Sequence, residues 1–126
     1  MRLWTIRDAQ LAALARSLAD DLIEQGLARL RREHPALVQG RDPAALRALV
    51  EKARSKGAAF RFSATADVLC WVELMLRLGA DFDALPQHAG ARAILEDPDL
   101  SAATRLSIVL DEAKRRGRDP RGGVTP

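Results

Sequence analysis

The sequence of 126 residues contains no tyrosine, one cysteine and two histidines, and its only aromatic residues are three phenylalanines and two tryptophans. Zinc sites need clustered cysteine and histidine ligands, whereas Cys70, His34 and His88 lie far apart in the chain. β-Strands favour β-branched and aromatic side chains, which are few here, while alanine, leucine, arginine and glutamate abound. The composition therefore predicts an all-α protein with no bound cofactor.

Long hydrophobic segments are also absent from the sequence. No apolar run approaches the roughly 18 to 20 residues that span a bilayer, and the N-terminus MRLWTIRDAQ lacks the apolar region of a signal peptide. A single cysteine cannot form an internal disulfide, which fits a reducing compartment. We therefore expect a cytoplasmic protein without a membrane-spanning segment.

Residue patterns that carry catalysis are missing as well. There is no phosphate-binding glycine loop, and Cys70 lies in a strongly apolar stretch, where it is a small core residue rather than a nucleophile. Carboxylates gather between Asp81 and Asp99, but calcium needs six to eight oxygen ligands and no EF-hand spacing is present. We expect neither an enzyme nor a metal-binding protein.

The length and composition fit one folded domain. Apolar residues make up 48% of the chain and charged residues 29%, which is ordinary for a globular protein of this size. We expect a single helical domain over residues 1–117. The remaining stretch, RDPRGGVTP, has little to bury, so we expect a disordered tail over residues 118–126.

Periodic apolar residues predict a compact bundle of about five helices. We expect these at about residues 6–33, 43–56, 63–78, 87–95 and 102–116. The third is apolar on nearly every side from Val68 to Leu78, which is typical of a buried helix. We therefore place the helix at about 63–78 in the centre of the bundle.

Residues that commonly begin or end helices predict where these helices start and stop. Ser63 and Ser101 are good N-caps, and Asp67 lies near the positive end of the central helix. Gly57 and Gly79 can each end a helix in the left-handed conformation, and Gly117 closes the last helix. Asp97 and Pro98 end the fourth helix before Ser101.

The segment Asp81-Phe82-Asp83 follows the central helix. We expect Phe82 to fold back as an apolar anchor and both aspartates to stay in water or to cap nearby amides. Together they would present a negative rim beside an apolar anchor, which makes all three tentative partner-binding residues.

The first helix offers a second candidate surface. Leu11, Leu14, Leu18 and Leu22 recur at steps of three and four, which is typical of an amphipathic helix. Leu27 and Leu30 continue this stripe with some rotation. We expect the part around Leu27 and Leu30 to be exposed and to contact a partner. A helix of this length could also form a homodimer.

Charge is distributed unevenly along the chain, whose net charge is +3. After residue 113, five basic residues and one acidic residue give +4, so residues 1–113 carry −1. Residues 41–61 carry +4, and residues 81–99 carry −4. A turn and a helix follow the basic segment, and this order is also that of a DNA-binding helix-turn-helix motif. The helix that would read DNA is nearly all apolar, so we expect no nucleic-acid partner.

The second half of the chain resembles a family of small helical proteins encoded in bacterial type VI secretion gene clusters. The resemblance rests on TADVLCWVELMLRLGADFD and ARAILEDPDLSAATRLSIVLDEA. Its pattern is an S-x-x-D-V start, with Asp67 one place later here, then L-G-x-D-F-D, I-L-x-D-P-x-L-S and a final R-L helix. Family members usually carry an aromatic residue where this chain has Gln87-His88-Ala89.

The resemblance implies a non-enzymatic accessory, similar to a chaperone or co-adaptor. Such a protein binds a secretion effector, its adaptor or a spike component in the cytoplasm. An alternative is an immunity protein that blocks a toxin with its acidic region from Asp81 to Asp99. A third possibility is DNA binding through residues 41–61 and the tail.

Overall fold

The computed structural model of this chain describes residues 2–118, with side chains for residues 8–116. Within this range the chain forms six α-helices and two short 3-10 helices and no β-strand. The predicted all-α bundle with a central buried helix is confirmed. Helix α6 continues to Arg118, and residues 119–126, where we expect a disordered tail, lie outside the described range.

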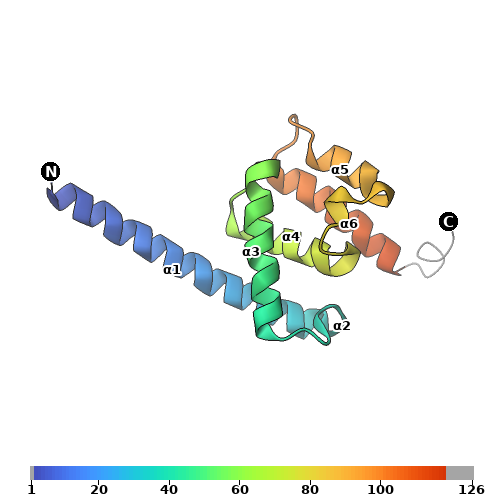
Figure 1. Cartoon of the computed structure of the whole chain (residues 1–126), viewed down its shortest axis with the longest axis horizontal. Helices are drawn as coiled ribbons and strands as arrows, with labels where there is room; N and C mark the ends of the chain where they lie inside the picture. Colours follow the sequence, from blue (N-terminus) through green and yellow to red (C-terminus); the bar gives the residue numbers. More distant parts are fainter. Residues whose placement is uncertain (1, 119–126) are drawn as a thin grey trace.

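Helix α1 runs from Arg2 to Glu33, and its N-terminal half projects away from the rest of the molecule (Figure 1). It ends before His34 as predicted, because a residue that precedes proline is pushed out of the helical conformation. The short helix α2 (Pro35–Val38) follows directly. The C-terminal part of α1 belongs to the bundle, whereas its N-terminal half lies outside it.

Helix α3 (Pro43–Phe60) begins as predicted, with the Asp42 carboxylate accepting a hydrogen bond of 2.7 Å from the Ala45 amide. Its predicted end at Gly57 is wrong. The helix continues for one more turn, and Arg61, with φ 61°, is the left-handed cap whose amide donates to the Gly57 carbonyl. Gly57 is needed for space: a Cβ there would lie 2.4 Å from the Phe62 carbonyl oxygen.

Helix α4 (Thr65–Leu78) is the centre of the bundle. Its Trp71 is fully buried and stacks among the rings of Phe60, Phe62 and Phe82, with ring centroids 5.0–5.3 Å apart. Asp67 lies in the first turn as predicted. The N-cap is Ala64 rather than Ser63, and no side chain caps this end, so the expected role of Ser63 is wrong.

The exit from α4 follows the prediction in part. Gly79 ends the helix with φ 111°, a positive value that favours glycine, but its ψ of 150° lies outside the left-handed helical region. The 3-10 helices η1 (Phe82–Ala84) and η2 (Pro86–His88) then lead into helix α5 (Ala89–Leu95). The helix expected over residues 87–95 therefore begins two residues later.

The turn from α5 to helix α6 (Ala102–Arg118) is formed as predicted. The Asp97 carboxylate accepts from the Asp99 amide at 2.9 Å, and Pro98 stands between these two residues. The Ser101 hydroxyl accepts from the Thr104 amide at 3.2 Å, which is an N-cap bond. The expectation that Gly117 closes α6 is wrong, because the helix continues through it.

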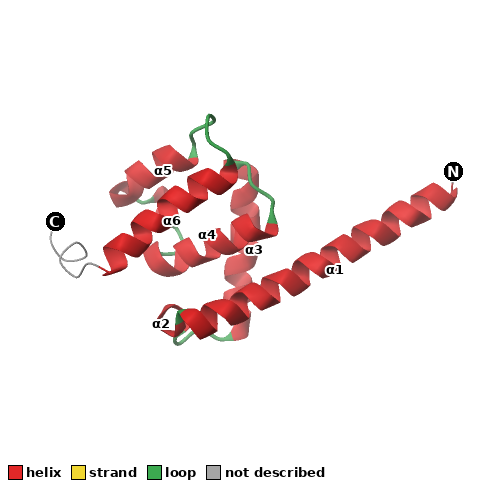
Figure 2. Cartoon of the chain, turned by 180° about the vertical axis from the view of Figure 1, so that it is seen from behind, coloured by secondary structure: helices red, strands yellow, loops and turns green. Residues whose placement is uncertain are grey.

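Helix α4 packs against α1, α2, α3 and α6, and α5 packs on α6. Figures 1 and 2 show this arrangement from opposite sides, with α3 crossing one side of α4 and α6 on another. The buried core consists of residues from α1 to α6 and η1, but its first member along the chain is Ile23. The described side chains of α1 before Ile23 therefore add nothing to the buried core.

Candidate protein-interaction surface

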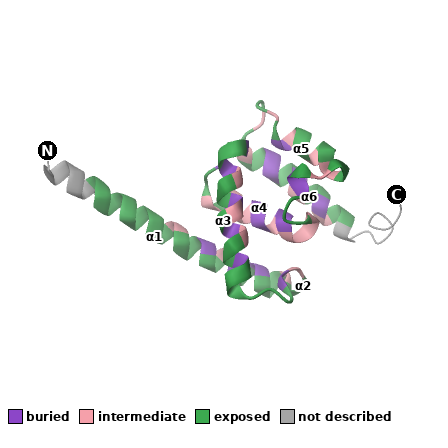
Figure 3. Ribbon diagram, viewed as in Figure 1, coloured by how far each residue is buried: buried purple, intermediate pink, exposed green. Residues whose placement is uncertain are grey.

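Among the side chains that the structure describes, the most exposed large apolar ones lie on the projecting half of α1. Leu11, Leu14, Leu18 and Leu22 are 58, 55, 54 and 50% exposed. We call these four residues the leucine stripe. Figure 3 shows this part of α1 as almost continuously exposed, in contrast to the bundle. Contiguous exposed apolar surface of this kind is typical of a binding site for another molecule.

Leu27 and Leu30, which we expected to be exposed, are only 3 and 8% exposed. They form one face of α1 together with Ile23, and this face packs in the core with α4. At about 100° per residue, this face lies about 140° round the helix axis from the leucine stripe. The two leucine sets are therefore separate faces, and the expected contact surface around Leu27 and Leu30 is wrong.

Gly26 lies where the buried part of α1 meets α4. A Cβ on Gly26 would lie 2.5 Å from Leu69 Cδ1, the end of a flexible side chain, so the absence of a side chain at Gly26 leaves room for Leu69 where the two helices meet. Arg47 and Arg54 of α3 bond Glu24 and Asp20 of α1 at 3.1 and 3.3 Å. These contacts hold α1 from Asp20 onward.

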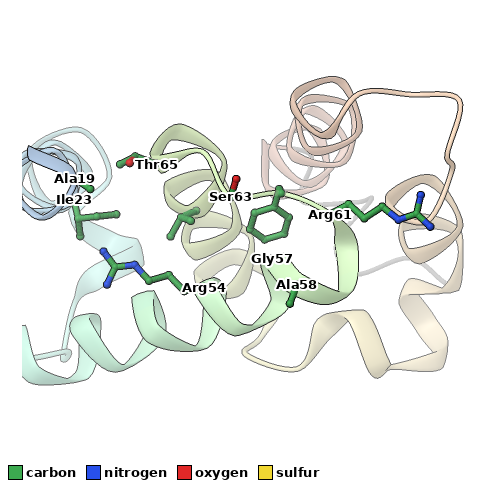
Figure 4. Close-up of a pocket in the computed structure, with 10 residues that line it drawn as sticks. Ala19, Ile23, Arg54, Gly57, Ala58, Arg61, Ser63 and Thr65 are labelled. Atoms are coloured by element: carbon green, nitrogen blue, oxygen red, sulfur yellow. The ribbon is translucent and has the colours of Figure 1, made fainter. Parts of the chain in front are cut away.

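A pocket of about 590 Å³ lies where the projecting half leaves the bundle (Figure 4). Ala19 and Ile23 of α1 line one side, and Gly57 and Ala58 of α3 line another. Arg54 also lines it, and its guanidinium bonds both Asp20 and Glu51. The pocket thus lies on the side of α1 that faces the bundle, round the helix axis from the leucine stripe.

The Asp81-Phe82-Asp83 segment joins α3 and α4 through side-chain contacts. Phe82 is fully buried against Trp71, so its predicted role as an apolar anchor is confirmed. Asp83 is only 4% exposed and accepts from Lys56 at 2.7 Å, so the expectation that it stays in water is wrong. Asp81 is exposed, and the Lys52 ammonium 2.5 Å away lowers the pKa of its carboxyl.

The basic and acidic segments that the sequence separates lie against each other in the fold. Lys52 and Lys56 of α3 pair with Asp81 and Asp83. The expected partner-binding rim of Asp81, Phe82 and Asp83 is thus largely engaged within the molecule. These two ion pairs join the basic segment to the acidic one, so the carboxylates of Asp81 and Asp83 do not form a free acidic surface.

Sequence reasoning missed the role of Arg105. This side chain is 7% exposed, and one guanidinium nitrogen donates to the carbonyl oxygens of Phe60, at 2.8 Å, and of Leu95. It therefore joins the C-terminal ends of α3 and α5, whose last carbonyls lack partners within their helices. The signal was its spacing, because Arg105 shares the buried stripe of Leu106, Val109 and Ala113.

A second, smaller groove lies between α5 and α6. It measures about 290 Å³ and includes Leu78, Ile94 and the 40% exposed Ile108. His88, which stands where the resembling family usually has an aromatic residue, lies edge-on to Phe82 with ring centroids 6.3 Å apart. Burial, and then the charge of Arg116, lower the pKa of His88.

Groups with catalytic or metal-binding potential are dispersed. Burial raises the pKa of the Cys70 thiol to about 12, so it is almost entirely protonated at neutral pH. Among the described residues, no three histidine, cysteine, aspartate or glutamate side chains come close enough to hold a metal ion. In the same part of the chain, none of the helices combines the length and the apolar character that crossing a membrane requires.

Comparison of the sequence with models of known protein families gives no match, and comparisons with curated proteins and with solved structures give none either.

Proposed function

We propose that this chain is a non-enzymatic protein-binding accessory, similar to a chaperone or co-adaptor, that binds a type VI secretion effector, its adaptor or a spike component. The single observation that carries the proposal is the leucine stripe, four half-exposed leucines on a helix that projects from the bundle. The contact surface assigned here is this stripe, in place of Leu27 and Leu30.

The chemistry of the projecting half favours a protein as its partner. Residues 2–22 contain three arginines and three aspartates, so this part of the sequence carries no net charge. It lacks the excess of basic residues that draws an amphipathic helix to an anionic membrane surface or to nucleic acid. An amphipathic helix with an apolar stripe commonly lies in a groove or against another helix of a protein partner.

The secretion context rests on the resemblance of the second half of the chain, and the cytoplasm is where an accessory would meet its client before export. The segments that carry the resemblance, Asp81-Phe82-Asp83 and Asp97-Pro98, hold the bundle together. These segments would define the fold of the bundle, while the projecting helix would bind the client protein.

Two observations favour this proposal over the alternatives. An immunity protein that acts through its acidic region would need free carboxylates, but Asp81 and Asp83 bond Lys52 and Lys56. DNA binding through residues 41–61 would need free cations, but Arg47 and Arg54 also bond carboxylates. Either alternative, where it uses these residues, would have to break these ion pairs first.

Affinity purification of the tagged chain from its native cell, with mass spectrometry of the proteins that accompany it, tests the proposal. We expect a secretion effector, adaptor or spike component with the wild type, and its loss from the double variant Leu14→Glu/Leu18→Glu. The matched control, Ala13→Glu/Ser17→Glu, puts the same two charges about 100° round the axis of the same exposed helix and should retain the partner. Equal recovery with both variants would contradict the proposal.

A growth assay separates the accessory from an immunity protein. Co-expression with the recovered effector should change its abundance or its loading without neutralising it. Restored growth of a toxin-expressing cell would instead establish the immunity function. If that rescue persists in Asp81→Ala/Asp83→Ala, the acidic region is not the blocking surface.

A further inference from the structure

The spacing of the leucine stripe suits a straight helix partner. Leu11, Leu14, Leu18 and Leu22 follow one another at steps of three, four and four residues, which make one repeat of eleven. Eleven residues in three turns come close to the natural period of the α-helix, so over this one repeat the line of side chains drifts by only about 20° round the axis. A second straight helix can therefore contact all four leucines.

The direction of the stripe leaves room for that second helix. The face of α1 that packs on the bundle, with Ile23, Leu27 and Leu30, lies about 140° round the axis from the stripe. A helix laid along the stripe therefore lies on the side of α1 away from this packed face. Beside the stripe, Ala15 and Ala19 are small, and they allow two helices to approach closely.

The stripe is complementary to itself in the antiparallel direction. Turning one copy end to end with Leu11 opposite Leu22 places Leu14 opposite Ala19 and Leu18 opposite Ala15 of the other copy, so each inner leucine meets an alanine, with a leucine one residue away. Asp8 then faces the level of Gln25, and Asp21 faces that of Ala12, so within residues 8–25 no like charges stand at the same level. The antiparallel order also puts the two bundles at opposite ends of the pair.

We propose that the occupant of the leucine stripe is a second copy of this chain, in an antiparallel pair formed by the projecting halves of α1. Four leucines on each copy form a smaller contact area than a standard interface, which buries roughly 1,200–2,000 Å². We therefore expect the pair to dissociate reversibly, with a dissociation constant on the order of micromolar or weaker. A client of the accessory would compete for this face, and that regulatory part alone rests on the proposed function.

Sedimentation equilibrium of the purified full chain, from about 1 to 300 µM to bracket a micromolar constant, tests the pair without any client. We expect the mass to rise from 13.8 kDa toward twice that value with concentration. Leu14→Glu/Leu18→Glu should stay monomeric, and Ala13→Glu/Ser17→Glu should associate like the wild type. Thermal melts followed by circular dichroism check that both variants fold.

A wild type that stays monomeric throughout, or a stripe variant that associates equally well, would overturn the proposal. Masses beyond two chains would also overturn it, because an isologous pair is closed. Failure of the pair with intact client recovery leaves the proposed function standing. Loss of client recovery with an intact pair overturns that function alone.

Disulfide trapping tests the antiparallel direction in a Cys70→Ala background. A mixture of Leu11→Cys and Leu22→Cys chains should cross-link to each other, whereas either chain alone should not, because the two like positions lie about 16 Å apart along the axis. Cross-linking of Leu11→Cys alone would show a parallel pair and contradict the proposed direction. Binding of the monomer to phosphatidylserine vesicles, in place of pairing, would contradict the choice of occupant.

Discussion

The projecting half of α1 and helix α4 both carry leucines at helical spacing, yet their environments are opposite. The four residues Trp71, Val72, Leu74 and Met75 of α4 are at most 1% exposed, whereas the leucine stripe is at least 50% exposed. Helix α4 has four helices of its own chain around it. The difference shows that apolar periodicity predicts a helix and its buried face, but not whether the covering surface belongs to the same chain.

The two helices also differ in what stabilises them. Packing of its apolar surface supports α4, whereas residues 8–22 of α1 depend on intrinsic helix propensity, to which alanines at positions 9, 12, 13, 15 and 19 contribute. An isolated helix of this length is marginal in water, because nucleation is costly. A partner along the stripe would supply the missing packing.

The largest expected effect compares one leucine from each region. Leu74→Ala empties a fully buried site and should lower the free energy of unfolding by about 2 to 5 kcal/mol. Leu14→Ala removes the same atoms from an exposed site and should change it by less than about 0.5 kcal/mol at low protein concentration. Urea unfolding of both variants measures this contrast, and equal losses would contradict the comparison.

Glycine substitutions sharpen the contrast within the bundle. Gly57→Ala brings a Cβ to 2.4 Å from the Phe62 carbonyl oxygen, which is backbone and cannot turn away, so we expect a loss of about 1 to 3 kcal/mol. Gly90→Ala in α5 is the matched control, because its Cβ meets nothing within 4 Å and alanine favours the helix. Thermal unfolding of both should move the two melting temperatures in opposite directions.

Two neighbouring ion pairs give a smaller effect. A double-mutant cycle with Lys56→Met and Asp83→Asn should show a coupling of about 1 to 2 kcal/mol, because Asp83 is buried and Lys56 is only partly exposed. The same cycle with Lys52→Met and Asp81→Asn should show a weaker coupling, because Asp81 stays in water. Equal couplings would show that burial does not decide the strength of these pairs.

The smallest expected effect is the titration of Asp81. The hydrogen bond and charge of Lys52 lower the pKa of Asp81 in the folded protein, so the pair stabilises the fold above the unfolded pKa. This contribution is lost as the pH falls through the folded pKa. NMR titration of the Asp81 carboxyl in wild type and Lys52→Met should show the pKa return toward its ordinary value. An unchanged pKa would remove Lys52 as the cause.

The sequence predicts the helices, the central position of α4 and most helix ends, because these follow from local spacing and from residues such as Asp42, Gly79 and Ser101. It fails at Gly57 and Ser63, where a close approach of two backbones and an added helical turn decide the boundary. Gly57 shows the difficulty, since a glycine needed for space and one needed for a left-handed cap look identical in a sequence.

The candidate surface is less predictable than the fold. The sequence shows that α1 carries two apolar sets but not which of them the bundle covers, because that choice depends on Gly26 meeting Leu69 of α4. From the sequence, the opposite charges of residues 41–61 and 81–99 suggest two separate charged binding surfaces. The fold instead brings Lys56 and Asp83 of these segments together. Both outcomes depend on contacts between residues far apart in the chain.

The most direct test of the central claim is native-state hydrogen exchange, followed by mass spectrometry at the lowest practical protein concentration. If the projecting half of α1 has no partner within its own chain, amides of residues 8–22 exchange orders of magnitude faster than those of α4, which exchange only when the bundle opens. Equal protection of the two segments in a monomeric sample would contradict the account, because it would require a surface of the same chain to cover the leucine stripe.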